Sequence, residues 1–139
     1  MHATRRILPW FFAGLLALTG CSATQSPAAT TTPAVSVAPA PSGAVLLTAL
    51  GVTHGPVGFW LPAGLQPVEV VDQDNVVVLL FAPGRASEVV DHLVSHAASM
   101  GFIVSDHNET SVLLAAPGWD AAFTSSVAAA GLTLRRTKG

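Results

Sequence analysis

The sequence predicts a small α+β domain, an antiparallel sheet with one main helix on a face, preceded by a signal peptide and a flexible linker. Two observations predict the domain: β-branched apolar runs separated by short polar breaks, and a single stretch with helical spacing. Half of the 139 residues are hydrophobic and 10% are charged, so one domain of this size can bury a core. The predicted boundaries are residues 1–20, 21–43 and 44–139.

Residues 1–20 have the order of an export signal. Arg5 and Arg6 give a positive start, and residues 7–18 are apolar throughout. This run is about a dozen residues long, whereas a helix needs about 20 to cross the hydrocarbon core of a bilayer. It is therefore predicted to be a signal peptide and not a transmembrane helix.

The apolar run ends in Leu18-Thr19-Gly20-Cys21, which resembles the lipobox of bacterial lipoproteins. The resemblance implies that the Cys21 thiol receives a diacylglyceryl group and that Cys21 becomes the new N-terminus after cleavage. The mature chain would then be held by its lipid on the extracytoplasmic face of the cell membrane, since two or three acyl chains make a stable anchor. The alternative is a secreted protein with an unlinked cysteine.

The linker that follows is uncharged and rich in Ala, Pro, Ser and Thr. Residues 22–42 show no hydrophobic periodicity and cannot bury a core. We expect this segment to be extended and flexible, and to separate the domain from the membrane.

The first clear hairpin lies at residues 68–81. Residues 68–71 and 76–81 are apolar and β-branched, and Asp72-Gln73-Asp74-Asn75 forms the predicted loop between them. Because residues 76–81 are apolar without alternation, this strand is predicted to be interior, with both faces covered. The helix can cover one face. We expect the apolar segment 45–47 to fold back over the other, and the alternative is cover by a second molecule.

The single convincing helix spans residues 87–100. Ser87 is the predicted N-cap, Glu88 favours the first turn, and Gly101 ends the helix. Apolar residues at helical spacing form the predicted buried stripe: Val89, Val90, Leu93, Ala97 and Met100.

A second hairpin is predicted from residues 102–104 and 111–116, and a third from residues 119–135, turning around Ser125-Ser126. The alternative for the tail is a helix ending at Gly131, which would give a ferredoxin-like β-α-β-β-α-β order. The order of elements from Val76 to Arg136 is similar to that of small uncharacterised actinobacterial lipoproteins. That resemblance bears only on fold and location.

Charge and cysteine content exclude several classes of function. Without Arg5 and Arg6 the chain keeps four basic residues against eight acidic ones, so we expect no nucleic-acid partner. Cys21 is the only cysteine, and its acylation would leave no thiol nucleophile and no cysteine metal ligand. No phosphate loop, nucleophile elbow or paired-carboxylate pattern occurs, so neither a cofactor nor catalysis is predicted.

The remaining candidates for chemistry are His92 and His96, four residues apart on the polar face of the predicted helix. Two imidazoles at this spacing can hold one Zn²⁺ or Cu²⁺. Leu93 stands where a zinc protease would carry its glutamate, so a hydrolytic site is not predicted. The sequence thus predicts a non-catalytic binding or accessory module with an envelope protein as partner. Metal binding by these two histidines is the alternative.

The lipid anchor is directly testable. Cys21→Ser removes the sulfur that would be acylated, so we expect loss of radiolabelled fatty acid from the protein and accumulation of the full-length precursor. Metabolic labelling and gel mobility measure both. Wild-type protein that is processed yet unlabelled and soluble would show that Cys21 is not an anchor.

Overall fold

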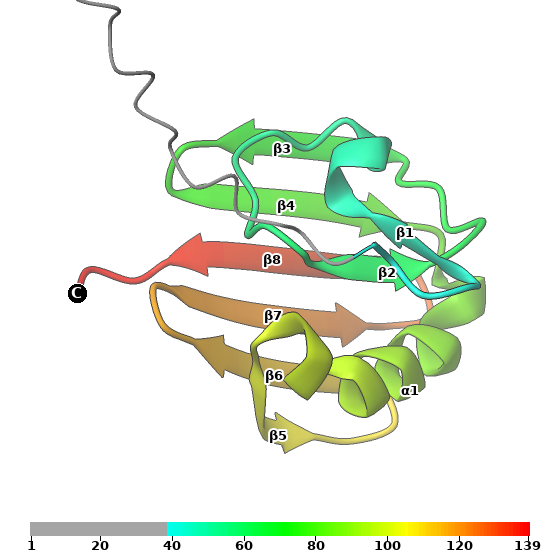
Figure 1. Ribbon diagram of the computed structural model, residues 1–139. Coiled ribbons are helices and arrows are strands. Elements are labelled where there is room, and N and C mark those ends of the chain that lie inside the picture. Colours follow the sequence, from blue (N-terminus) through cyan, green and yellow to red (C-terminus); the bar gives the residue numbers. More distant parts are fainter. Residues whose placement is uncertain (1–38) are drawn as a thin grey trace, which may run out of the picture. The chain divides into compact units, whose positions relative to one another are not determined.

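The computed structural model describes residues 39–139. The predicted signal peptide, Cys21 and the linker up to residue 38 lie outside the described residues. The described part is a sheet-dominated α+β unit with a six-stranded antiparallel sheet, a separate two-stranded sheet and one α-helix (Figure 1).

The large sheet has the strand order β3-β4-β8-β7-β6-β5. The β3–β4 hairpin and the meander from β5 to β8 are joined by antiparallel pairing of β4 with β8, and the edge strands are β3 and β5. The strands are β3 (Glu69–Gln73), β4 (Val76–Phe81), β5 (Ile103–His107), β6 (Ser111–Ala116), β7 (Trp119–Ser125) and β8 (Ala130–Arg136).

All remaining elements lie on one side of this sheet (Figure 1). The small sheet and the helix are in contact, and together they form a second layer. These elements are β1 (Ala44–Leu46), η1 (Leu47–Leu50), β2 (Trp60–Pro62), η2 (Pro83–Arg85), α1 (Ala86–His96) and η3 (Ala98–Met100). Among residues 39–139, no helix has the length and apolar character needed to cross a membrane.

A single hydrophobic core fills the space between the two layers. Side chains alternate along a strand, so the four inner strands β4, β8, β7 and β6 contribute alternate residues to the core. The second layer contributes Leu47, Phe59, Leu61 and Leu93. The sheet contributes Val77, Leu79, Phe81, Val112, Leu114, Ala121, Phe123, Leu132 and Leu134.

The predicted hairpins and helix are confirmed, with local differences. The 68–81 hairpin is tighter than expected, because Asp72 and Gln73 belong to β3 and only Asp74-Asn75 form the turn. The α-helix ends earlier than expected, at His96, and the short 3-10 helix η3 continues it up to Gly101, which is left-handed with φ of 82°. Ser87 is not the N-cap: α1 begins at Ala86, and the first turn instead contains an ion pair between Arg85 and Glu88.

The tail is the predicted hairpin of β7 and β8, and not the helix of the ferredoxin-like alternative. Trp119 to Ser125 pairs residue by residue with Arg136 to Ala130. The strand pattern of alternate burial decides this, since Ala121 and Phe123 are buried while their neighbours are not.

The prediction that residues 45–47 cover the second face of β4 is wrong. Val77, Leu79 and Phe81 are buried, whereas Val76, Val78 and Leu80 remain partly exposed on the other face. The strand is interior, between β3 and β8, but the apolar segment at residues 45–47 packs on the same side as α1, where Leu47 joins the core. We call the uncovered side of the large sheet the open face.

Two adjacent leucines on β6 test this assignment. Leu114 is 3% exposed in the core and Leu113 is 43% exposed on the open face. Leu114→Ala should lower the free energy of unfolding by about 2–5 kcal/mol, whereas Leu113→Ala should change it by less than about 1 kcal/mol. Urea unfolding of the two variants gives the comparison. Equal losses would mean that the open face is covered within the monomer.

Candidate functional site

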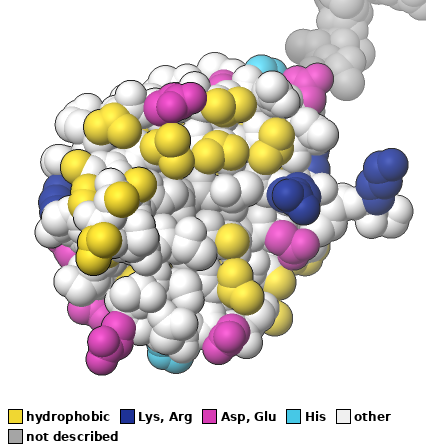
Figure 2. All heavy atoms as spheres, turned by 180° about the vertical axis from the view of Figure 1, so that it is seen from behind, with side chains coloured by type: hydrophobic (Ala, Val, Ile, Leu, Met, Phe, Trp, Pro, Cys, Tyr) yellow, Lys and Arg dark blue, Asp and Glu magenta, His cyan; other side chains and the backbone are white. Residues whose placement is uncertain are grey.

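The open face is the largest surface of the domain that lacks a second layer among residues 39–139. Residues paired in register lie on the same side of a sheet, so the registers define rows across it. The middle row, from edge β3 inward, is Val71, Val78, Thr133, Ala122 and Leu113. Seen from behind, apolar side chains gather in a band near the top of this face and in a second group below it (Figure 2).

The centre of the open face is hollow because its residues are small. Two hollows of about 370 and 380 Å³ share Thr133 as a lining residue. Their floor consists of Ala122, Thr124, Gly131 and Thr133 on β7 and β8. Their walls carry Val78 and Leu80 on one side and Leu113 and Ala115 on the other. We call this feature the central groove.

Glycine at position 131 keeps the groove open. A Cβ atom at this position would lie 3.3 Å from Cδ2 of Leu80, closer than ordinary van der Waals contact. Any side chain here would therefore press on the wall of the groove and fill its floor.

Acidic residues stand beyond both walls. Glu69 pairs in register with Leu80, and Asp106 pairs with Leu113. Asp120 and Arg135 pair with each other at one end of the floor. In the described part of the chain none of these four residues forms an ion pair, so the open face carries three free carboxylates and one free guanidinium.

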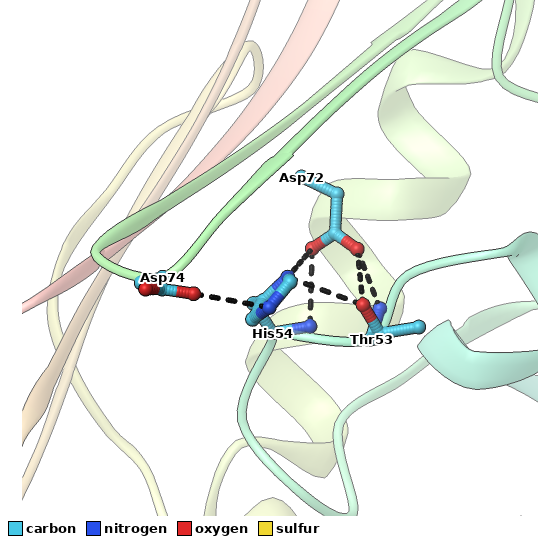
Figure 3. A network of polar contacts seen from close by, with 4 residues as sticks. All are labelled: Thr53, His54, Asp72 and Asp74. Carbon is cyan, nitrogen blue, oxygen red and sulfur yellow. Dashed lines mark hydrogen bonds and ion pairs between the residues drawn. The ribbon is translucent and has the colours of Figure 1, made fainter.

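A second polar cluster lies on the covered side, where the loop after η1 meets β3 (Figure 3). Asp72 accepts hydrogen bonds from the backbone N–H and the hydroxyl of Thr53, both at 2.7 Å, and from the backbone N–H of His54 at 3.1 Å. The His54 ring lies between two carboxylates, with Nδ1 3.4 Å from Asp72 and Nε2 3.0 Å from Asp74.

These contacts keep Asp72 ionised. Partial burial, which leaves the side chain 17% exposed, acts to raise its pKa. The hydrogen bonds from Thr53 and His54 and the nearby His54 ring outweigh burial, and the pKa of Asp72 falls to about 2.

The geometry of this cluster indicates a structural latch. The Thr53 hydroxyl lies 3.1 Å from His54 Nδ1 but donates its proton to Asp72, so His54 does not act on it as a general base. Asp72 and Asp74 lie at opposite nitrogens of the imidazole and therefore do not converge on one point with it. The cluster fastens the loop to edge strand β3.

The sequence-predicted pair, His92 and His96, is brought together by α1. The rings stack with centroids 4.6 Å apart and planes 29° apart. His92 Nε2 lies 3.3 Å from the carbonyl oxygen of Trp60, and His96 Nδ1 lies 3.0 Å from that of His92. A carbonyl only accepts, so each of these nitrogens carries the proton and the other ring nitrogen carries the lone pair.

Burial and the neighbouring His96 lower the pKa of His92, which favours the neutral form that metals bind. Among residues 39–139, however, no group of three His, Cys, Asp or Glu side chains is arranged to hold a metal ion. The pair is therefore placed as predicted but has no third ligand of these types, and metal binding by His92 and His96 stays a prediction.

Sequence reasoning missed the latch and the groove. Thr53 and Asp72 are 19 positions apart, and neither belongs to a recognisable motif. The groove floor is a set of small residues on alternate positions of β7 and β8, a pattern visible only once the hairpin register is known. The consecutive arginines Arg135 and Arg136 point to opposite sides of the sheet: Arg136 lies over the Trp119 ring at 5.0 Å, and Arg135 lines the groove.

Comparison with known proteins adds no assignment: no protein family, no curated protein and no solved structure matches this chain.

The latch predicts a specific loss of stability in acid. The pKa of Asp72 in the folded state, about 2, lies below its ordinary value of 3.8, so its stabilisation is complete above about pH 4 and is lost as pH falls toward 2. Solvent screening at this partly exposed site limits the contribution to about 1 kcal/mol.

Asp72→Asn should therefore cost about 1 kcal/mol at pH 7 and flatten the change in unfolding free energy between pH 4 and pH 2. Asp74→Asn is the control, since this side chain is 94% exposed and its one ion pair among residues 39–139 is with His54. Urea unfolding at a series of pH values measures both. The same pH dependence in Asp72→Asn and wild type would show that the latch does not stabilise the fold.

Proposed function

We propose that this protein is a membrane-anchored cell-envelope lipoprotein whose domain is a non-catalytic binding module, with the open face as its binding surface. In this proposal residues 1–20 are a lipoprotein signal peptide, and residues 21–43 carry the lipid on Cys21 and a flexible linker. The observation that carries the binding role is the row of apolar side chains on the open face, which the described residues leave without a cover.

The exposed apolar side chains of the open face form groups and are not scattered singly. Ile103 is 69% exposed and Leu113 is 43% exposed, and both stand on the open face beside the partly exposed Ala115. Val71, Val78 and Leu80 continue the apolar surface on the other side of the groove. Exposed apolar groups rimmed by charged residues are typical of a protein–protein contact surface.

The position of the first strand is compatible with a lipid anchor. β1 lies in the layer opposite the open face (Figure 1), so the chain enters the domain from the covered side. A linker attached there leaves the open face free to meet a partner while the lipid stays in the bilayer. At about 3.1 Å per residue, an extended linker would span several nanometres.

The polar clusters of the described residues favour binding over catalysis. The Thr53 hydroxyl is committed to Asp72, and His92 and His96 each engage a backbone carbonyl. None of these groups faces the central groove, whose lining is mainly small and apolar.

Site-specific photo-crosslinking in intact envelopes tests the binding role. A photoreactive amino acid at Leu113 reports on the open face, and the same residue at the exposed Ala98 reports on the helix side. We expect protein adducts from position 113 and not from position 98. Adducts of equal yield from both positions, or none from position 113, would contradict the proposal.

A further inference from the structure

We propose that the central groove binds one amphipathic helix of a partner protein, with basic residues on both sides of the helix's apolar stripe. This inference rests on the proposed binding role of the open face. It adds the conformation and the charge of the segment that binds.

The dimensions of the groove fit a helix. Its walls stand on β4 and β6, which are three strand spacings apart, or about 14 Å at ~4.8 Å per spacing. An α-helix with its side chains is about 10–12 Å wide. The floor runs along β7 and β8 for roughly 20 Å, the length of about four helical turns.

The distribution of side-chain size favours a helix over a second sheet. Two twisted sheets packed face to face approach most closely near their centres, where large side chains must interdigitate. Here the centre is Gly131 and Ala122, and the large apolar residues stand on the flanking strands. A cylinder fills such a trough, whereas a second copy of this face would enclose a void.

The acidic residues beside the groove predict which charges the partner helix carries on both sides of its apolar stripe. Glu69 lies beyond the wall formed by Leu80, and Asp106 lies beyond the wall formed by Leu113, on the opposite side of the groove. Lys or Arg residues at both margins of an apolar stripe would meet these carboxylates. Two copies of the open face would instead repel each other, because each carries three carboxylates and one guanidinium.

The other candidate within the chain fits less well. Residues 22–38 are uncharged and rich in Ala, Thr, Ser and Pro, so they offer neither a stripe of large apolar residues nor basic flanks. A basic amphipathic helix satisfies both the apolar walls and the acidic rims of the groove.

Three synthetic peptides of 18 residues test the proposal against the chain from residue 22 onward, which contains every described residue. The first has a leucine stripe at helical spacing with lysine at both margins. In the second, glutamate replaces each lysine. The third has the composition of the first with two central prolines, which prevent a helix.

Amide shifts in nuclear magnetic resonance titrations report the site and the affinity. We expect the lysine peptide to shift Val78, Leu113, Ala122 and Thr133, and to bind at least about tenfold more tightly than the glutamate peptide at low salt. The double variant Glu69→Lys and Asp106→Lys should reverse that preference. Ala122→Tyr, which fills the floor, should abolish binding, whereas Ala98→Tyr on the helix side should not.

Each other result overturns the inference in a distinct way. If the proline peptide shifts the same amides equally, the open face binds ligands but not a helix, and the proposed function survives. Open-face shifts that depend on protein concentration alone would assign the groove to a second copy. Shifts caused by deleting residues 22–38 would assign it to the chain itself. Shifts confined to the helix side, or none, would remove the open face as a binding surface.

Discussion

The fold depends on one constraint: a sheet has two faces, and this domain buries only one of them. Strand alternation divides the residues of β4 into Val77, Leu79 and Phe81 on the covered face and Val76, Val78 and Leu80 on the open face. Everything outside the large sheet, from β1 to η3, packs on the covered face. The core is therefore a single layer of contacts, and no polar or charged residue among those described is buried in it. The stability of the fold comes from that layer, and the side chains of the open face are not part of the core.

The margin of the covered layer is held by polar contacts, because apolar burial weakens toward the sheet edge. Val70, on the covered side of edge strand β3, is still 37% exposed. Its neighbour Asp72 points into the same side, and an isolated carboxylate there would be costly. Thr53 and His54 supply three hydrogen bonds to it, so the charge that limits burial at this edge also fastens the loop that covers it. The core and the latch thus act on the same face and stabilise the same arrangement.

The sequence predicted most of the secondary-structure elements, but it did not predict on which face of the large sheet each of them packs. Hairpins and the helix follow from local period and turn residues, and the helical segment of α1 and η3 ends at Gly101. The run Val76–Phe81 led to a wrong prediction, because six apolar residues in succession indicate that both faces of a strand are covered. Three of the six lie on the open face instead. Nothing in the local pattern of Leu47 shows which side of a sheet the segment will join. The latch joins residues 19 apart without periodicity, so only the tertiary structure brings Thr53 to Asp72.

Both edges of the large sheet carry features that disfavour pairing with a further strand. Unpaired strand edges invite further strands, and proteins block them with bulges, charges or covering loops. β5 has a break in register between Val104 and Asp106, which disrupts a regular edge. β3 carries Glu69 at its exposed start and the latched loop against Asp72. In the proposed binding mode, side chains of the open face and not backbone groups of the edge strands make the contact. A partner that brings its own closed backbone, as a helix does, can use the apolar walls of the groove without needing a free strand edge.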